Sequence, residues 1–155
     1  MPQPLVCKDY DTFRNTMSDA HDALIMLGKS VDSRGLDKTL SELVKLRVSI
    51  INRCAFCTQL HLDIARVLNI PQSKLDLISS WRDAGVFSAR EAAALEWAEH
   101  LTMLPGQPLP DTVKERVSVH FSREEFELLT VTIGVINCWN RIAGGLQFPP
   151  QSVKK

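Results

Sequence analysis

The chain has 155 residues, of which 45% are hydrophobic, so its length and apolar content suit one domain with a single core. Lysine plus arginine and aspartate plus glutamate each total 18, which leaves no net charge that would attract nucleic acid or an anionic membrane. We therefore expect a single domain over residues 1–155 that binds neither of these partners.

The first third of the chain shows helical periodicity. Apolar residues recur every three or four positions over residues 13–27, which predicts an amphipathic helix, and Gly28 marks its expected end. After a turn-like segment at residues 32–35, Asp37 is the expected N-cap of a second helix. Apolar residues fall on most sides of this helix over residues 40–51, which predicts that it is buried.

The rest of the chain also favours helices. Asn52 is the expected N-cap of a third helix that Pro71 interrupts, and a short helix is expected around residues 75–78. Residues 88–91 and 122–125 match the capping box, in which a serine and a glutamate satisfy free amides at a helix start. Because no segment shows sustained strand alternation, the sequence predicts an all-α fold, a single-domain helical bundle.

The N-terminal segment, residues 1–9, bears on the compartment. It has no basic stretch followed by a long apolar run, so it does not resemble a secretion signal, and no segment is long enough to span a bilayer. We therefore expect a cytoplasmic protein. Stable structural disulfides are rare in the cytosol, so a close cysteine pair there is more often catalytic or metal-binding.

Such a pair lies in the segment Cys54-Ala-Phe-Cys57-Thr-Gln-Leu-His61. In a helix, Cys54 and Cys57 are neighbours across one turn, and Cys57 and His61 are neighbours across the next. A thiol beside a base has what a nucleophilic cysteine needs, and a second thiol can capture the oxidised sulfur as a disulfide. If Asn52 caps the helix, its first-turn amides would also stabilise a Cys54 thiolate. The spacing predicts thiol redox chemistry.

Glu42 can join this group only if the chain reverses direction. In one continuous helix, Glu42 and Cys54 would lie about 18 Å apart along the axis. If the chain turns near Asn52, the two helices run antiparallel, and Glu42 comes level with His61. A carboxylate there could orient the imidazole in a nucleophile, base and orienter arrangement. The alternative for Glu42 is an exposed ion pair with a lysine one turn away, which contributes little.

Glu42, Cys54, Cys57 and His61 together resemble the catalytic pattern of the alkylhydroperoxidase D-like (AhpD-like) branch of the carboxymuconolactone decarboxylase superfamily, over about residues 40–68. The resemblance implies an all-helical fold with the Cys-x-x-Cys at the start of a central helix. It also implies a homo-oligomer, with a trimer or hexamer favoured, and a peroxidase cycle in antioxidant defence that needs no cofactor or metal. The implied partners are a peroxide substrate and a dithiol electron donor of the protein or lipoyl type.

The same resemblance implies a role for each residue. Cys57 corresponds to the thiol that attacks peroxide, Cys54 to the resolving thiol, and Glu42 with His61 to the proton relay. This sequence departs from the family pattern at one position. Well-known members carry a histidine directly before the second cysteine, and Phe56 occupies that place here. We therefore expect simpler or slower proton delivery.

Other interpretations of the motif stay open. Two thiolates and an imidazole are three zinc ligands, although a structural zinc site normally needs a fourth. A non-enzymatic metal-binding or redox-sensing module is therefore one alternative, and buried cysteines that act only as small hydrophobes are another. A third alternative is lactone decarboxylation, in which acid and base residues act on a ring substrate without a cysteine pair.

The remaining candidates have structural interpretations. Two further cysteines lack nearby bases in sequence and are expected to be inert: Cys7 and Cys138. Three histidines are expected to be surface or cap residues: His21, His100 and His120. Three tryptophans fall among apolar helix positions and are expected in the core or in subunit contacts: Trp81, Trp97 and Trp139. In the polar cluster Asn137, Asn140 and Arg141, the arginine is expected to be a capping cation.

Overall fold

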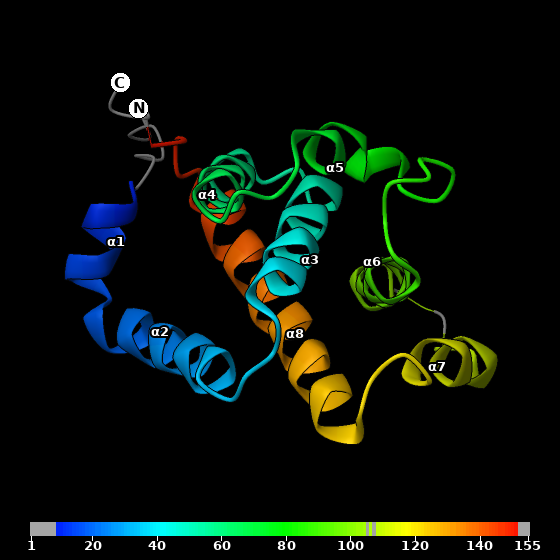
Figure 1. The fold of residues 1–155 in the computed structure, drawn as a ribbon. Coiled ribbons are helices and arrows are strands. Elements are labelled where there is room, and N and C mark those ends of the chain that lie inside the picture. The colour runs from blue at the N-terminus through cyan, green and yellow to red at the C-terminus, as the bar shows by residue number, and fades with distance from the viewer. Residues whose placement is uncertain (1–8, 105, 107, 152–155) are drawn as a thin grey trace.

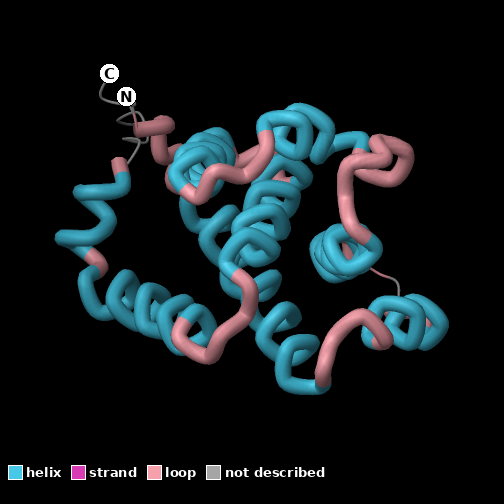
Figure 2. Tube along the Cα trace, in the orientation of Figure 1, coloured by secondary structure: helices cyan, strands magenta, loops and turns pink. Residues whose placement is uncertain are grey.

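The computed structural model describes residues 9–104, 106 and 108–151, and every regular element in these residues is a helix (Figure 2), which confirms the all-α prediction. In chain order the helices are α1 (Tyr10–Thr16), α2 (Ser18–Asp32), α3 (Lys38–Ile51), α4 (Ala55–Val67), α5 (Gln72–Leu77), the 3-10 helix η1 (Ile78–Ser80), α6 (Ala89–Thr102), α7 (Asp111–Ser118) and α8 (Arg123–Gly145). None of the described helices combines the length and apolar character needed to cross a membrane.

Helices α3 and α8 cross in the middle of the molecule, with α1 and α2 on one side and α6 and α7 on the other (Figure 1). Helix α3 packs against α4, α6 and α8. The larger core joins apolar side chains of α3, α6 and α8, among them Leu40, Val44, Val48, Ala94, Ala98, Leu129 and Ile133. Other apolar residues of α3 face a second core that includes Leu43, Leu46, Ala65, Leu75 and Leu95. Helix α3 is therefore buried on several sides, as its sequence predicts.

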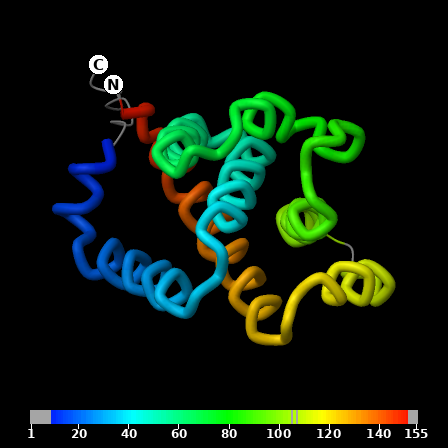
Figure 3. The backbone as a smooth tube through the Cα atoms, in the orientation of Figure 1, coloured from blue at the N-terminus to red at the C-terminus, as the bar shows by residue number. Residues whose placement is uncertain are grey.

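The two ends of the described chain meet beside α4. The start of α1 and the segment after α8 lie close together (Figure 3). The ring of Phe148 contacts Tyr10 and Phe13, with ring centroids 6.2 and 5.7 Å apart. These aromatic residues form a third cluster with Cys54 and Cys57. The cysteine pair is therefore covered by segments from both ends of the chain.

Three predicted helix starts are confirmed. The Asp37 carboxylate accepts a hydrogen bond from the Leu40 amide at 2.7 Å and so caps α3. Both capping boxes are present, with Ser88 at the start of α6 and Ser122 at the start of α8. In each box the serine hydroxyl accepts an amide of the first turn, and the glutamate three residues later accepts the amide of the serine.

Two predicted helix boundaries are wrong in the first helical segment. The chain leaves helical geometry at Met17 (φ −128°, ψ 46°), whose amide closes α1 by bonding to the Phe13 carbonyl, so the expected single helix is two helices. Helix α2 then continues through Gly28 to Asp32. A glycine inside a helix costs only about 1 kcal/mol relative to alanine, which the packing of a longer helix can offset.

Replacing Ser122 with alanine tests the capping box of α8. The substitution removes the hydroxyl that accepts the Glu125 amide, and a lost N-cap typically costs about 1 kcal/mol of unfolding free energy. Ser73→Ala is the matched control, because Ser73 is an exposed residue inside α5 and Pro71 is the N-cap there. Urea denaturation should show a lower midpoint for the Ser122 variant alone, and equal midpoints would contradict the assigned cap.

Candidate active site

A tight turn between α3 and α4 positions the cysteine pair. Asn52 is the C-cap of α3, Arg53 lies in the left-handed region (φ 53°), and the Cys54 amide bonds to the Ser49 carbonyl at 3.0 Å. Helix α4 then packs back against α3, which confirms the predicted reversal. The prediction that Asn52 caps α4 is wrong, because Cys54 is the N-cap of that helix.

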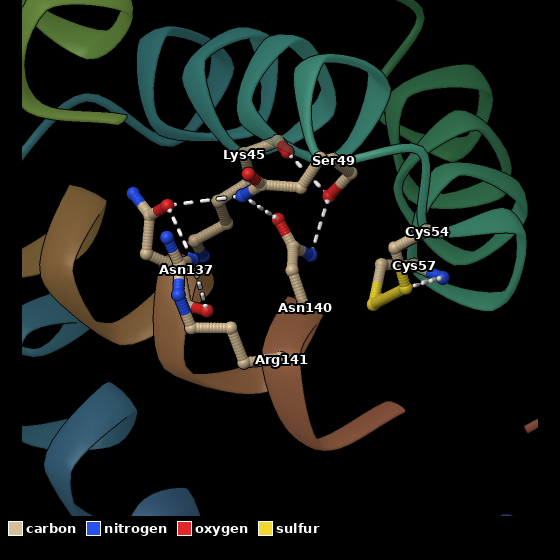
Figure 4. The surroundings of a disulfide bond; sticks show 8 residues. Lys45, Ser49, Cys54, Cys57, Asn137, Asn140 and Arg141 are labelled. Carbon is tan, nitrogen blue, oxygen red and sulfur yellow. Dashed lines mark hydrogen bonds between the residues drawn. A yellow bond between two sulfur atoms is a disulfide. The ribbon is translucent and has the colours of Figure 1, made fainter. Parts of the chain in front are cut away.

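The side chain of Asn52 explains this difference. Its amide group donates to the Oδ1 atoms of Asn137 and Asn140, both at 2.9 Å, and Asn140 donates to the Ser49 hydroxyl at 3.1 Å. Figure 4 shows Asn137 and Asn140 on α8 beneath the end of α3, next to the cysteine pair. Helix α8 thus holds the turn that leads into Cys54, and the Asn52 side chain is not free to cap α4.

Cys54 and Cys57 form a disulfide at the start of α4, with their Cα atoms 5.4 Å apart. Both residues are 3% exposed. The Cys57 amide donates to the Cys54 sulfur at 3.3 Å, so this sulfur is the N-terminal cap of the helix. A position facing free helix amides favours negative charge, and a thiolate there is stabilised relative to the thiol.

His61 and Glu42 form a buried pair beside Cys57. The Nδ1 atom of His61 lies 2.7 Å from Glu42 Oε2, and Lys45 donates to Glu42 Oε1 at 3.0 Å. The alternative of an ion pair with a lysine one turn away is therefore correct for the pairing, but wrong for the exposure, because Glu42 is 1% exposed. With Nδ1 directed at the carboxylate, Nε2 is the ring nitrogen left to exchange a proton with a reacting group.

The Glu42 carboxylate keeps its negative charge despite burial. Burial by itself raises the pKa of this carboxyl, but the hydrogen bond and charge of His61 and the contact with Lys45 together lower the pKa from 4.5 to about 2. Glu42 is therefore a fixed anion at neutral pH. An anion in this place favours the protonated imidazole that forms when His61 accepts a proton.

Cys57 and His61 share a cavity of about 350 Å³. Its wall is formed by α1, α2, α3, α4 and α8, and most of it is apolar, with contributions from Leu24, Ile25, Leu60, Ile136 and Trp139. Lys29, Asp32 and Lys45 add charged groups to the wall. Cys54 is not among the residues that line this cavity, so of the two sulfurs Cys57 is the one presented to it.

Among the residues that the structure describes, no group of three or more histidine, cysteine, aspartate or glutamate side chains is arranged to hold a metal ion.

The other candidate residues have mixed outcomes. Trp81 and Trp97 are buried, as predicted. Cys138 is an exposed free thiol on α8, and Cys7 lies outside the described residues. Arg141 donates to the backbone and side-chain oxygens of Asn137, in the preceding turn of α8, so the prediction that it caps the last carbonyls is wrong.

The prediction for His21 is also wrong. His21 is 7% exposed, and its ring is surrounded by Tyr10, Phe13 and Trp139. The Tyr10 hydroxyl lies 2.8 Å from His21 Nε2, and Asp22 Oδ1 lies 2.9 Å from Nδ1. In the sequence, the adjacent Asp22 could have indicated a hydrogen-bonded histidine. The burial of His21 could not be predicted in this way, because it depends on α8, which is far away in the chain.

Comparisons with known proteins agree with this fold. The uncharacterized protein YdfG of Bacillus subtilis is 36% identical over 115 residues, which cover 74% of this chain and 78% of YdfG. The crystal structure of ATU0492 from Agrobacterium tumefaciens, a protein of unknown function provisionally described as the antioxidant defence protein AhpD, is 36% identical with a TM-score of 0.88. That similarity covers 94% of this chain and all of ATU0492.

A more distant structure shares the fold. An uncharacterized peroxidase-related protein with an alkylhydroperoxidase AhpD core, from Ralstonia eutropha, has a TM-score of 0.80 at 18% identity and matches 91% of this chain and 75% of its own. The family model described as the carboxymuconolactone decarboxylase family matches residues 19–100, which is more than half of the chain and includes the whole motif. The chain therefore belongs to the carboxymuconolactone decarboxylase family and has its AhpD-like helical fold.

Proposed function

We propose that the protein is a thiol-dependent peroxidase and disulfide reductase in which Cys54 and Cys57 cycle between dithiol and disulfide. The observation that carries the proposal is the disulfide at the start of α4, whose Cys57 shares a cavity with the Glu42-paired His61. A redox-active pair with an oriented base on a substrate-sized cavity is what peroxide reduction requires. The AhpD-like fold supports the same class of activity.

The proposed cycle begins with the reduced pair. His61 Nε2 accepts the Cys57 thiol proton, and the thiolate attacks one oxygen of the peroxide. The O–O bond breaks, an alcohol or water leaves with a proton, and Cys57 becomes a sulfenic acid. The Cys54 thiol then attacks this sulfur, which forms the disulfide and releases water. An external dithiol supplies two electrons and two protons and restores both thiols.

The positions of the two sulfurs support this division of roles. Cys57 lines the cavity, so a peroxide in the cavity can reach its sulfur. Cys54 accepts the Cys57 amide, and this contact favours the Cys54 thiolate that attacks the sulfenic acid. The short spacing lets the second thiol react before another peroxide arrives and so limits overoxidation.

The proposal includes the partners implied by the motif. The electron donor is a dithiol of the protein or lipoyl type, and the enzyme acts in the cytoplasm as a homo-oligomer, with a trimer or hexamer favoured. Several large apolar side chains support an interface between subunits because they are exposed in the single chain, among them Met26, Met103, Val119 and Val131.

Mass spectrometry of alkylated thiols tests the cycle directly. The reduced protein should lose the Cys54 and Cys57 thiols together on addition of one equivalent of alkyl hydroperoxide, with formation of one disulfide-linked peptide. Cys138 should remain alkylatable throughout and serves as the internal control. Peroxide that leaves both motif thiols free would remove the proposal. Decarboxylation of a muconolactone by the Cys54→Ser, Cys57→Ser double variant would favour the lactone alternative instead.

A further inference from the structure

The proposed cycle does not use His21, although this histidine is buried and both of its ring nitrogens have hydrogen-bond partners. Nδ1 lies 2.9 Å from the Asp22 carboxylate, and Nε2 lies 2.8 Å from the Tyr10 hydroxyl. The Asp22 side chain is 78% exposed, whereas the His21 side chain is 8% exposed. Asp22, His21 and Tyr10 thus form a continuous chain of proton-carrying groups, in which the buried His21 lies between an exposed carboxylate and a half-buried phenol.

The Tyr10 end of this chain reaches the cavity of the candidate site. Tyr10 lines the same cavity as Cys57 and His61. Its ring also stacks on Phe56, with ring centroids 5.5 Å apart and an interplanar angle of 26°. Phe56 lies directly before Cys57, so the Tyr10 ring packs against the cysteine motif. Each of two residues that line the cavity is therefore bonded to a histidine or carboxylate outside it: His61 to Glu42, and Tyr10 to His21.

Peroxide cleavage needs groups with two different tasks. One must accept the thiol proton, and the other must protonate the departing oxygen, because an alkoxide is a poor leaving group. His61 with the buried Glu42 is suited to accepting a proton. Burial raises the pKa of the Tyr10 hydroxyl, with a smaller opposing effect of Arg14 and a smaller supporting effect of Asp11, so the phenol stays in the form that can donate.

We propose that Tyr10 is a catalytic acid that protonates the leaving oxygen of the peroxide, and that His21 positions and reprotonates it. This inference rests on the proposed peroxidase function. It assigns proton donation to α1 and α2, and the stacking of Tyr10 on Phe56 places the donor beside the residue that precedes Cys57.

The Cys57 thiolate forms a bond to one peroxide oxygen, and the O–O electron pair stays with the departing alkoxide. The alkoxide takes the Tyr10 hydroxyl proton, and the Tyr10 oxygen takes the proton that a protonated His21 carries on Nε2. His21 keeps its Nδ1 proton against Asp22 and becomes neutral, and solvent later returns a proton to the ring.

Comparing oxidation rates with two peroxides distinguishes a loss of acid catalysis from a loss of packing. Tyr10→Phe removes only the hydroxyl and retains the ring that stacks on Phe56. Single-turnover oxidation of the reduced protein by tert-butyl hydroperoxide should slow about 100-fold, the usual loss for a missing general acid. Oxidation by peracetic acid should proceed at the wild-type rate, because acetate leaves without needing a proton.

A second variant and a control complete the experiment. His21→Gln should show the same selective loss with tert-butyl hydroperoxide. Phe148→Leu alters the packing against the Tyr10 and Phe56 rings without removing a proton donor or acceptor, so it should affect both oxidants alike. Equal slowing with both oxidants in Tyr10→Phe, or no slowing with either, would overturn the role of Tyr10 while wild-type reactivity still supports the peroxidase. A wild-type protein unreactive toward both oxidants would instead remove the proposed function and this inference together.

Discussion

Replacing Cys57 with serine is expected to abolish peroxide turnover. The hydroxyl of serine is a far weaker nucleophile toward peroxide than a thiolate, so no sulfenic acid can form at the cavity wall. Cys54→Ser should behave differently, because Cys57 can still react once and then has no resolving thiol. A coupled assay with excess dithiol should show no steady-state rate for either variant. Stoichiometric consumption of one peroxide per chain is expected only in Cys54→Ser.

Cys138→Ser is the matched control for this pair. Cys138 is an exposed free thiol on α8, outside the motif, and its replacement should leave the rate unchanged. Retained turnover in Cys57→Ser would show that the nucleophile has been assigned to the wrong sulfur. Loss of turnover in Cys138→Ser would show that the pair at the start of α4 is insufficient.

Glu42→Gln is expected to destabilise the protein and to slow oxidation of Cys57. The substitution removes a buried negative charge, so His61 and Lys45 lose the anion that they share. Breaking one side of a buried ion pair typically costs about 3 kcal/mol or more of unfolding free energy. Without the carboxylate, the imidazolium formed by proton transfer loses its support, so the rate of sulfenic acid formation should fall as well.

The stability difference should depend on pH in a defined direction. The pKa of Glu42 is lowered from 4.5 to about 2 in the folded protein, so the folded state holds the proton less tightly than the unfolded state does. Its contribution to stability from this pKa difference, about 3 kcal/mol, is fully present above pH 4.5 and is lost as the pH falls toward 2. The gap between wild type and Glu42→Gln should therefore be largest near neutral pH and shrink in acid.

An exposed glutamate provides the control for this measurement. Glu124 pairs with Arg34, and both side chains are more than half exposed, so Glu124→Gln should change stability by only a few tenths of a kcal/mol. Chemical denaturation at pH 6 and pH 3 gives the comparison. A constant gap between wild type and Glu42→Gln at the two values would contradict the assigned charge.

The parts of the site that follow from local spacing could be predicted from the sequence. The three- and four-residue intervals of Cys54, Cys57 and His61 require only that α4 is a helix. Glu42 required one further assumption, the reversal after α3, and the chain does turn there. The capping boxes of α6 and α8 are likewise local, because serine and glutamate interact within one helical turn.

The parts that depend on distant residues could not be predicted. The local preference of asparagine favours a helix start at Asn52, but its side chain bonds to asparagines 85 and 88 residues away. His21 is polar and lies on an amphipathic helix, so a surface position is the local expectation. Its burial arises because α2 packs against Trp139 of α8. Tertiary packing overrides local preference at both positions.

The link between Asn52 and α8 bears on how much the protein must move during a redox cycle. The two cysteines are three positions apart, so their disulfide closes only a four-residue loop. Breaking it therefore removes little constraint from the chain. The backbone entering Cys54 is held from outside the loop by Asn137 and Asn140. Oxidation and reduction should therefore leave the surrounding helices in place, and a partner would meet the same surface in both states.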